Sequence, residues 1–459
     1  MPASLLAALA IPLLGLLPGL LLLRRIGGLQ GPVRSQDRDR ADRWIETLVI
    51  ATGVSVLLSG WLALILAELE VFSLGLLFLV EALIGGVLLV PVRLGEQRST
   101  WSGASDDATG SAELGSRSVG SSPRSSWPNG RELITLGAGL VIVVSLGAVY
   151  LNPSEHVLGG QDPGVYVVTG AIIAETGGIV IHDRELAELP PAARALLFPD
   201  PPVRFAEGSR QIGLYLTDSA RGRVVPHGLH YYPAAIAVMV ALGGLPWGLA
   251  TGGLFTLLGV AMVGLAAKEA FGRATGLLAA ALLSVNVAQV WFARYPAAEP
   301  LAQVQLWLGL FALTRLLRGS DRLPVGQQRL LAALAGWSLG LLLLTKVELV
   351  VVPAVVVGFL WYLGLTGRFR PAYWWLLAPY SAVALHALLH YGLIATWYVY
   401  SALTLDRYGI ALASISVLGG LIAGGSLALR TRLEPVALSL ERHGARFTTG
   451  AAVAIAGAA

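Results

Sequence analysis

Residues 231–268 read YYPAAIAVMVALGGLPWGLATGGLFTLLGVAMVGLAAK and contain two apolar runs of unequal length. The second run, 247–267, is long enough for a helix to cross the hydrocarbon core of a bilayer, which takes about 20 residues. The first, 231–242, is only about a dozen residues long, and Gly243, Gly244 and Pro246 separate it from the second. We therefore expect the second run to span the membrane and the first to lie along the outer membrane surface or dip back.

Apolar runs of spanning length recur along the whole chain. Of its 459 residues, 55% are hydrophobic and 13% are charged, far from the usage of soluble proteins. Because a backbone in lipid must satisfy its own hydrogen bonds, these runs predict an all-α multi-pass membrane protein with about 11–12 spans. We expect spans at 4–23, 45–66, 71–90, 133–151, 247–267, 274–292, 298–314, 330–344, 349–365, 373–395 and 410–429. A last apolar run starts near 448 and stops at Ala459 before it could cross, so we expect the natural chain to continue.

The positions of Lys and Arg predict the topology, because short cytoplasmic loops carry their excess. Arginines between 24 and 43 place that loop inside, so 93–131, rich in Ser and Gly, is a cytoplasmic linker and 152–246 an extracytoplasmic loop. If 231–242 does not cross, the basic clusters at 268–273, 315–322, 368–370 and 430–432 also lie inside. We thus expect a three-helix extension (1–92), the linker (93–131) and a membrane core (132–459) in the plasma membrane.

The external loop itself shows local order. Asp162 precedes Pro163, the pairing expected at the start of a helix over 163–176, which Gly177 and Gly178 end. Residues 211–225 alternate around a turn and predict a hairpin. The loop of 152–246 is therefore expected to combine helix and hairpin.

Charge and cysteine content exclude other classes of function. The formal charge is only +4 and the arginines form short separate clusters, so nucleic acid binding has no support. The chain has no cysteine, which excludes disulfides and thiolate chemistry.

Several short motifs follow one another in and after the external loop. They read GGQDPGVY at 159–166, GLYLTD at 213–218, GRVVP at 222–226, HYYP at 230–233, FARYPAAEP at 292–300 and LTK at 344–346. In this order and spacing the chain resembles the glycosyltransferase C superfamily, in particular bacterial enzymes similar to protein O-mannosyltransferases and the aminoarabinose transferase of lipid A. The resemblance covers about 133–429.

The resemblance implies an enzyme that transfers a hexose or pentose from a polyprenyl phosphate to a lipid, glycan or protein on the outer side. It makes Asp162 the catalytic base or acceptor-orienting group, although many relatives carry two adjacent acids where Asp162 is followed by Pro163. Cations from neighbouring helix ends would bind the donor phosphate. The candidates for this role are Arg294, Lys346 and Arg407, and further candidates for the donor or acceptor site are Tyr166, His227, His230 and Glu299.

Each candidate also has a purely structural interpretation. Asp162 could act only as a helix cap, Lys346 could reach the interface as any lysine at a helix end does, and Arg294 could pair with Glu299 across a turn. His386 and His390 are expected to form hydrogen bonds within the bundle. A divalent metal is compatible with the chemistry, but no residue pattern supports one, so we predict no metal site and no cofactor.

Two other functions remain alternatives. A transporter or lipid flippase would place ionisable residues within broken helices near mid-membrane. A non-catalytic relative could instead serve as a scaffold of the cell envelope. Convergence of Asp162, Arg294 and Lys346 on one outer cavity would favour the transferase, and their scatter would favour the scaffold.

Overall fold

The computed structural model of the chain describes residues 14–25, 40–89, 146–155, 157, 162–197, 210–211, 213–319, 322–403 and single positions between 425 and 439. The expected spans 133–151 and 410–429, the last apolar run, the linker 93–131 and Arg407 lie wholly or mostly outside these residues.

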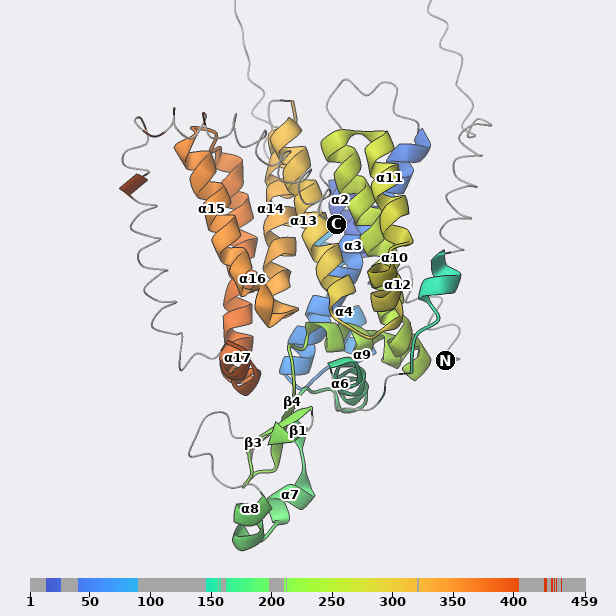
Figure 1. Ribbon diagram of the computed structural model, residues 1–459, viewed down its shortest axis with the longest axis vertical. Coiled ribbons are helices and arrows are strands. Elements are labelled where there is room, and N and C mark those ends of the chain that lie inside the picture. The colour runs from blue at the N-terminus through green and yellow to red at the C-terminus, as the bar shows by residue number, and fades with distance from the viewer. Residues whose placement is uncertain are drawn as a thin grey trace, which may run out of the picture.

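The described chain is a helical bundle that carries a small sheet at one end (Figure 1). Six of its helical segments, 42–68, 245–271, 299–319, 325–344, 347–365 and 371–393, are long and apolar enough to cross a membrane. They match six of the expected spans and confirm a largely helical membrane protein. The elements of the bundle are α2 (Leu17–Arg25), α3 (Arg40–Glu68), α4 (Leu74–Leu89), α10 (Leu245–Phe271), α11 (Arg273–Ser284), α12 (Val287–Arg294), α13 (Glu299–Gly319), α14 (Val325–Leu341), η1 (Leu342–Leu344), η2 (Val347–Val351), α15 (Val352–Leu365), η3 (Pro371–Tyr373), α16 (Trp374–Leu393) and α17 (Thr396–Leu403).

One expected span is broken. We predicted a single helix over 274–292, but α11 and α12 meet at an angle of 62°. Asn286 caps the second helix by accepting hydrogen bonds from the backbone N–H groups of Ala288 and Gln289. A residue that caps a helix in the middle of an apolar run restarts the helix in a new direction.

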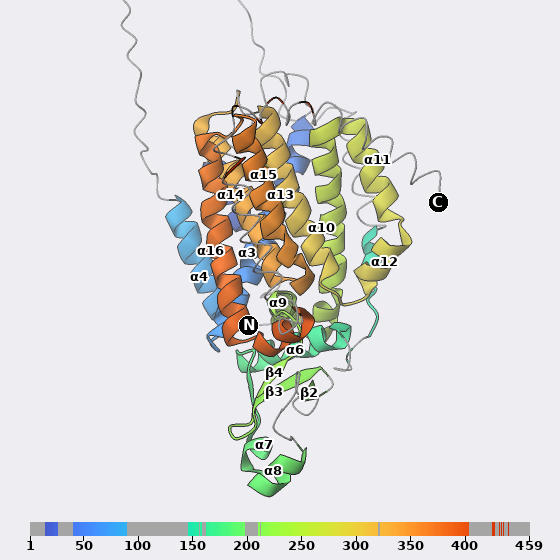
Figure 2. The same ribbon diagram turned by 60° about the vertical axis from the view of Figure 1, so that its left-hand side comes forward.

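Two short helices lie across the end of the bundle. They are α6 (Asp162–Thr176) and α9 (Tyr231–Gly243), and both views show them transverse to the spanning helices (Figures 1 and 2). We predicted that 231–242 lies along the outer membrane surface or dips back, and in the structure protein encloses α9, because its residues 231–238 are all buried. The Tyr231 hydroxyl donates to the Leu57 carbonyl of α3 at 2.7 Å. The helix is apolar on every side because α3, α6 and α10 all pack against it.

The small sheet stands beyond α6 and α9, at what we call the loop end of the bundle (Figure 1). Its strand order is β1-β4-β3-β2, with antiparallel pairing throughout. The hairpin expected at 211–225 is β3 and β4, and its turn contains Gly222 with φ +62°. A side chain there would also meet the Asp183 carbonyl at 1.8 Å. The elements of this region are β1 (Ile181–His182), α7 (Arg184–Glu188), α8 (Pro191–Leu197), β2 (Arg210–Gln211), β3 (Leu214–Asp218) and β4 (Arg223–Pro226).

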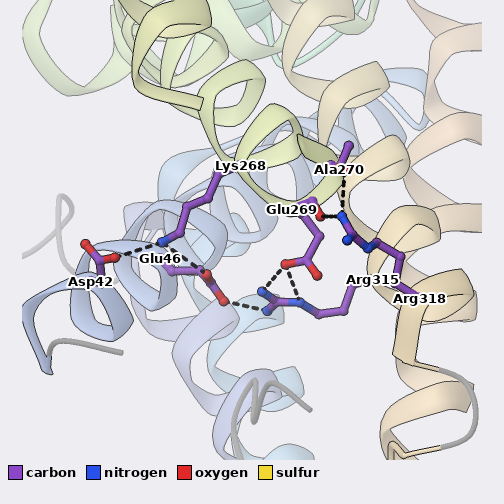
Figure 3. Close-up of polar contacts among 7 residues, drawn as sticks. All are labelled: Asp42, Glu46, Lys268, Glu269, Ala270, Arg315 and Arg318. Carbon is purple, nitrogen blue, oxygen red and sulfur yellow. Dashed lines mark hydrogen bonds and ion pairs between the residues drawn. The ribbon is translucent and has the colours of Figure 1, made fainter. Parts of the chain in front are cut away.

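A buried ion-pair network joins the helices at the opposite end, which we call the basic end. Arg315 of α13 is 1% exposed and lies between the carboxylates of Glu46 in α3 and Glu269 in α10 (Figure 3). Lys268 of α10 extends the network to Asp42 of α3 at 3.3 Å. The first helices therefore pack into the same core as the later ones.

Candidate active site

The breaks between helices at the loop end bring together side chains from distant parts of the chain. α6 begins there, β4 ends there, α13 begins there, and the helical path breaks between η1 and η2. We call the side chains gathered at this place the loop-end cluster, and it consists of Asp162, Tyr166, Tyr215, His227, Glu299, Lys346, Glu348 and Tyr398.

Asp162 and His227 lie close together within the cluster. The Asp162 Oδ1 atom lies 3.9 Å from His227 Nε2, and the two side chains are 63% and 19% exposed. The His227 ring is held in place, because its Nδ1 atom is 3.1 Å from the Tyr215 hydroxyl and its ring centroid is 4.7 Å from that of Tyr398. A carboxylate beside an oriented imidazole is an arrangement that can accept a proton from a bound hydroxyl group.

Lys346 brings one positive charge to the cluster. Its Nζ donates to Glu299 Oε1 at 2.7 Å. Burial by itself would lower the pKa of Lys346, but the hydrogen bond and charge of Glu299, with the charges of Glu348 and Asp162, raise it above its usual range. The ammonium group is therefore charged and sits among three carboxylates.

The other two expected phosphate ligands do not join Lys346 in the described cluster. Arg294 donates from Nε to the Asn152 carbonyl at 2.8 Å, and its own carbonyl accepts from the Ser154 N–H. Arg294 thus holds the start of the segment 152–246 against α12, and we find no described ion pair between it and Glu299. Arg407 lies outside the described residues.

Two buried tyrosines line the inner wall of the cluster. Tyr166 of α6 packs edge-on against Tyr232 of α9, with ring centroids 5.6 Å apart. Burial, followed by the charges of Asp162 and other acids, raises the pKa of Tyr166 well above its usual range, so its hydroxyl stays protonated. The Tyr232 hydroxyl is buried and has no hydrogen-bond partner among the described residues. A phenol hydroxyl is a hydrogen-bond donor, and Tyr166, at 5% exposed, is the less buried of the two.

An apolar cavity lies behind these tyrosines. It has a volume of about 520 Å³ and is lined mainly by side chains of α3, α9 and α10. Phe255, one of its walls, packs against Tyr232 with ring centroids 6.4 Å apart. Two ring contacts, Tyr166–Tyr232 and Tyr232–Phe255, therefore connect the loop-end cluster to the wall of the cavity.

His230 is not accessible from the cluster, although it follows His227 by only three positions. Its side chain is completely buried, between the Pro226 carbonyl and His390. Burial lowers the pKa of His230 to about 3, so the ring is neutral. No group of three or more acidic or histidine side chains among the described residues is placed to hold a metal ion.

Sequence reasoning did not identify Tyr215 and Tyr398 as site residues. Tyr215 comes from the hairpin and Tyr398 from α17, and an aromatic residue near a membrane boundary is expected without any binding role. No sequence signal connects them to Asp162. The alternation of 211–225 does place Tyr215 on a predicted hairpin, which is the nearest clue.

Comparison with known proteins does not identify a family. No protein-family model, no curated protein and no solved structure matches the chain. The resemblance to glycosyltransferases therefore depends on the motifs alone, and a function must be argued from the site.

Proposed function

We propose that the chain is an integral membrane glycosyltransferase that moves a sugar from a polyprenyl phosphate to an acceptor on the outer side of the plasma membrane. The observation that supports this most is the approach of Asp162 to His227 at the loop end, from which ring contacts of Tyr166, Tyr232 and Phe255 lead to an apolar cavity. The basic end lies at the far ends of α10 and α13, as expected if the loop end faces outward.

Asp162 acts in this proposal as the base. It takes the proton of an acceptor hydroxyl group while the hydroxyl oxygen forms a bond to the anomeric carbon of the sugar. The bond from that carbon to the phosphate oxygen breaks, and the polyprenyl phosphate leaves with the electron pair. The attack inverts the anomeric carbon, and His227 keeps the Asp162 carboxylate oriented.

Lys346 stabilises the leaving phosphate. In the structure its ammonium is bound to Glu299, so the donor phosphate must replace that carboxylate as its partner. Such an exchange leaves no positive charge unpaired before the substrate arrives. The three acids near Lys346 would repel a free phosphate, which gives the prenyl chain a role in holding the donor.

The apolar cavity suits the chain of such a donor. Its lining is almost wholly hydrocarbon, from residues such as Val56, Met239, Leu254 and Phe255. Each buried methylene group contributes about 0.8 kcal/mol of transfer free energy. A chain bound there would keep the phosphate near the loop-end cluster without a strong phosphate site.

The test uses the full-length protein in lipid nanodiscs with radiolabelled polyprenyl-phosphate sugars and native membrane extracts as acceptor. Asp162→Asn is expected to reduce transfer about 100-fold or more, because a general base contributes about 10²–10⁴ in rate. Asp218→Asn changes a half-exposed acid at the hairpin turn; it is the matched control and should transfer normally. Near-normal transfer by Asp162→Asn would remove this residue from the mechanism, and no transfer by the unaltered protein from any donor would overturn the proposal.

One observation favours a second candidate, a lipid flippase or transporter. Glu81 lies in the middle of the apolar helix α4 and is 5% exposed. One of its carboxyl oxygens accepts from the Ser59 hydroxyl at 2.5 Å, and the other has no partner among the described residues. Ser59 also lines the apolar cavity. If proteoliposomes translocate a labelled lipid and Glu81→Gln stops this while transfer is absent, the flippase replaces the transferase.

A further inference from the structure

A second set of ionisable side chains lies directly behind His227, and the proposed reaction does not use it. We call this set the buried histidine chain, and it consists of Glu68, His386, His390 and His230. Its members come from α3, α16 and the residue before α9, so it joins the N-terminal helices to the later core.

The links of the chain are short. Glu68 Oε1 is 2.6 Å from His390 Nδ1, and Glu68 Oε2 is 2.8 Å from His386 Nε2. His390 Nε2 lies 3.1 Å from His230 Nδ1, and His230 Nε2 lies 3.1 Å from the Pro226 carbonyl oxygen. His390 and His230 are each almost fully buried, so water cannot replace these partners.

The chemistry of the two end groups determines where the hydrogens lie. A carbonyl oxygen only accepts, so His230 Nε2 must carry a hydrogen, and in the neutral ring Nδ1 is then an acceptor. The hydrogen between the two imidazoles must therefore come from His390 Nε2. His390 Nδ1 needs a second hydrogen to bind Glu68. His390 is thus an imidazolium, and the Glu68 carboxylate is the charge that permits it in a buried place.

The other end of the buried histidine chain reaches the candidate active site. Pro226 is the last residue of β4, and His227, which follows it, donates its backbone N–H to the Gly213 carbonyl at 2.9 Å. The two links hold both polar groups of the peptide unit that joins Pro226 to His227, and so fix the backbone that leads into the His227 Cα atom. The His227 ring then projects toward Asp162, Tyr215 and Tyr398.

We propose that Glu68 is a positioning residue for the Asp162–His227 pair, acting through the two buried histidines that separate them. Neutralising Glu68 removes the carboxylate that faces His390 Nδ1 in a buried place. The bond from His390 to His230 then loses the charge that strengthens it, so it weakens, and with it the hold on Pro226. The N-terminal helices, whose role the sequence leaves unassigned, thus complete the support of the site. The link to catalysis rests on the proposed function, but the link to hairpin geometry does not.

The test compares Glu68→Gln with Glu70→Gln in the full-length protein in nanodiscs. Glu70 is the matched control, because it pairs with a histidine of the same loop end, His182 at 3.4 Å, in an exposed position. With seven histidines in the chain, ¹⁵N-histidine NMR can resolve an imidazolium signal. We expect this signal at neutral pH in the unaltered protein and in Glu70→Gln, and its loss in both Glu68→Gln and His390→Gln.

Hydrogen exchange of residues 213–230 reports the position of the hairpin without any substrate. We expect exchange to rise about tenfold in Glu68→Gln and in His390→Gln, as the loss of a hydrogen bond to a charged group predicts, and not in Glu70→Gln. The double variant should show no further increase, because both changes break one chain. An imidazolium signal that survives Glu68→Gln, or exchange equal to that of Glu70→Gln, would overturn the inference. A failed transfer assay with these results intact would reject only the proposed function.

Discussion

Replacing Arg315 by methionine is expected to destabilise the protein more than any single surface change. The guanidinium is 1% exposed, and its two acidic partners, Glu46 and Glu269, are 5% and 9% exposed at their side chains. Methionine fills a similar volume but leaves both carboxylates without their main partner. Breaking a buried pair in this way typically costs about 3–5 kcal/mol. At about 2 cal/mol/K of unfolding entropy per residue, a loss of ~4 kcal/mol over 459 residues lowers the unfolding midpoint by roughly 4 °C.

The measurement is thermal unfolding in detergent, followed by tryptophan fluorescence. The exposed arginine Arg221, paired with Asp218 at 3.7 Å, is the control, and Arg221→Met should leave the midpoint unchanged. A triple variant that also carries Glu46→Leu and Glu269→Leu should recover most of the loss, because no buried charge then lacks a partner. If Arg315→Met melts with the unaltered protein, or the triple variant melts lower still, the reasoning on buried charge at the basic end is wrong.

Three further outcomes are expected. Burial holds the pKa of His230 at about 3, whereas an unfolded histidine titrates near 6.5, so the unfolded chain binds the proton more readily. The free energy of unfolding should therefore fall by about 2 kcal/mol between pH 7 and pH 5. His230→Gln should flatten the dependence of the melting temperature on pH over this range. Gly336→Ala should disrupt the packing of α14 on α16, because its Cβ would lie 1.9 Å from the Leu376 carbonyl oxygen. The control is Gly358→Ala in α15, whose Cβ meets nothing, so it should raise the unfolding midpoint slightly. Expression levels and thermal unfolding of the two variants test this. Asp183→Ala removes the side chain that accepts the first N–H bond of α7, a loss of about 1 kcal/mol that should appear as faster hydrogen exchange at 184–188 and nowhere in the bundle.

Much of the bundle could be predicted, because insertion in lipid depends on local hydropathy. The run 247–267 lies within α10, and 231–242 became a separate short helix that ends at Gly243. Glycine and proline at the junction were sufficient to predict the break. The bend between α11 and α12 was missed, because Asn286 adds little polarity to an apolar window and acts through a cap.

The candidate site could be predicted only in part. Asp162 and Lys346 share one electrostatic neighbourhood, as expected for ends of helices on the same side of the bundle. Arg294 lies on that side too, but its side chain binds the Asn152 carbonyl. This contact depends on the path of the loop and not on which side of the membrane each helix end faces. Glu68 was overlooked, because it is the last residue of an ordinary apolar helix and its partners lie more than 300 residues away in the sequence.

Hydropathy along the chain was enough to establish a membrane protein, its main helices and a polar loop region, because each of these depends on the length of one apolar run. Which carboxylate meets which imidazole was decided by packing alone. Glu68 reaches His390 only because the C-terminal end of α3 meets α16 at the rotation that the core imposes, and no local pattern in either helix encodes that rotation.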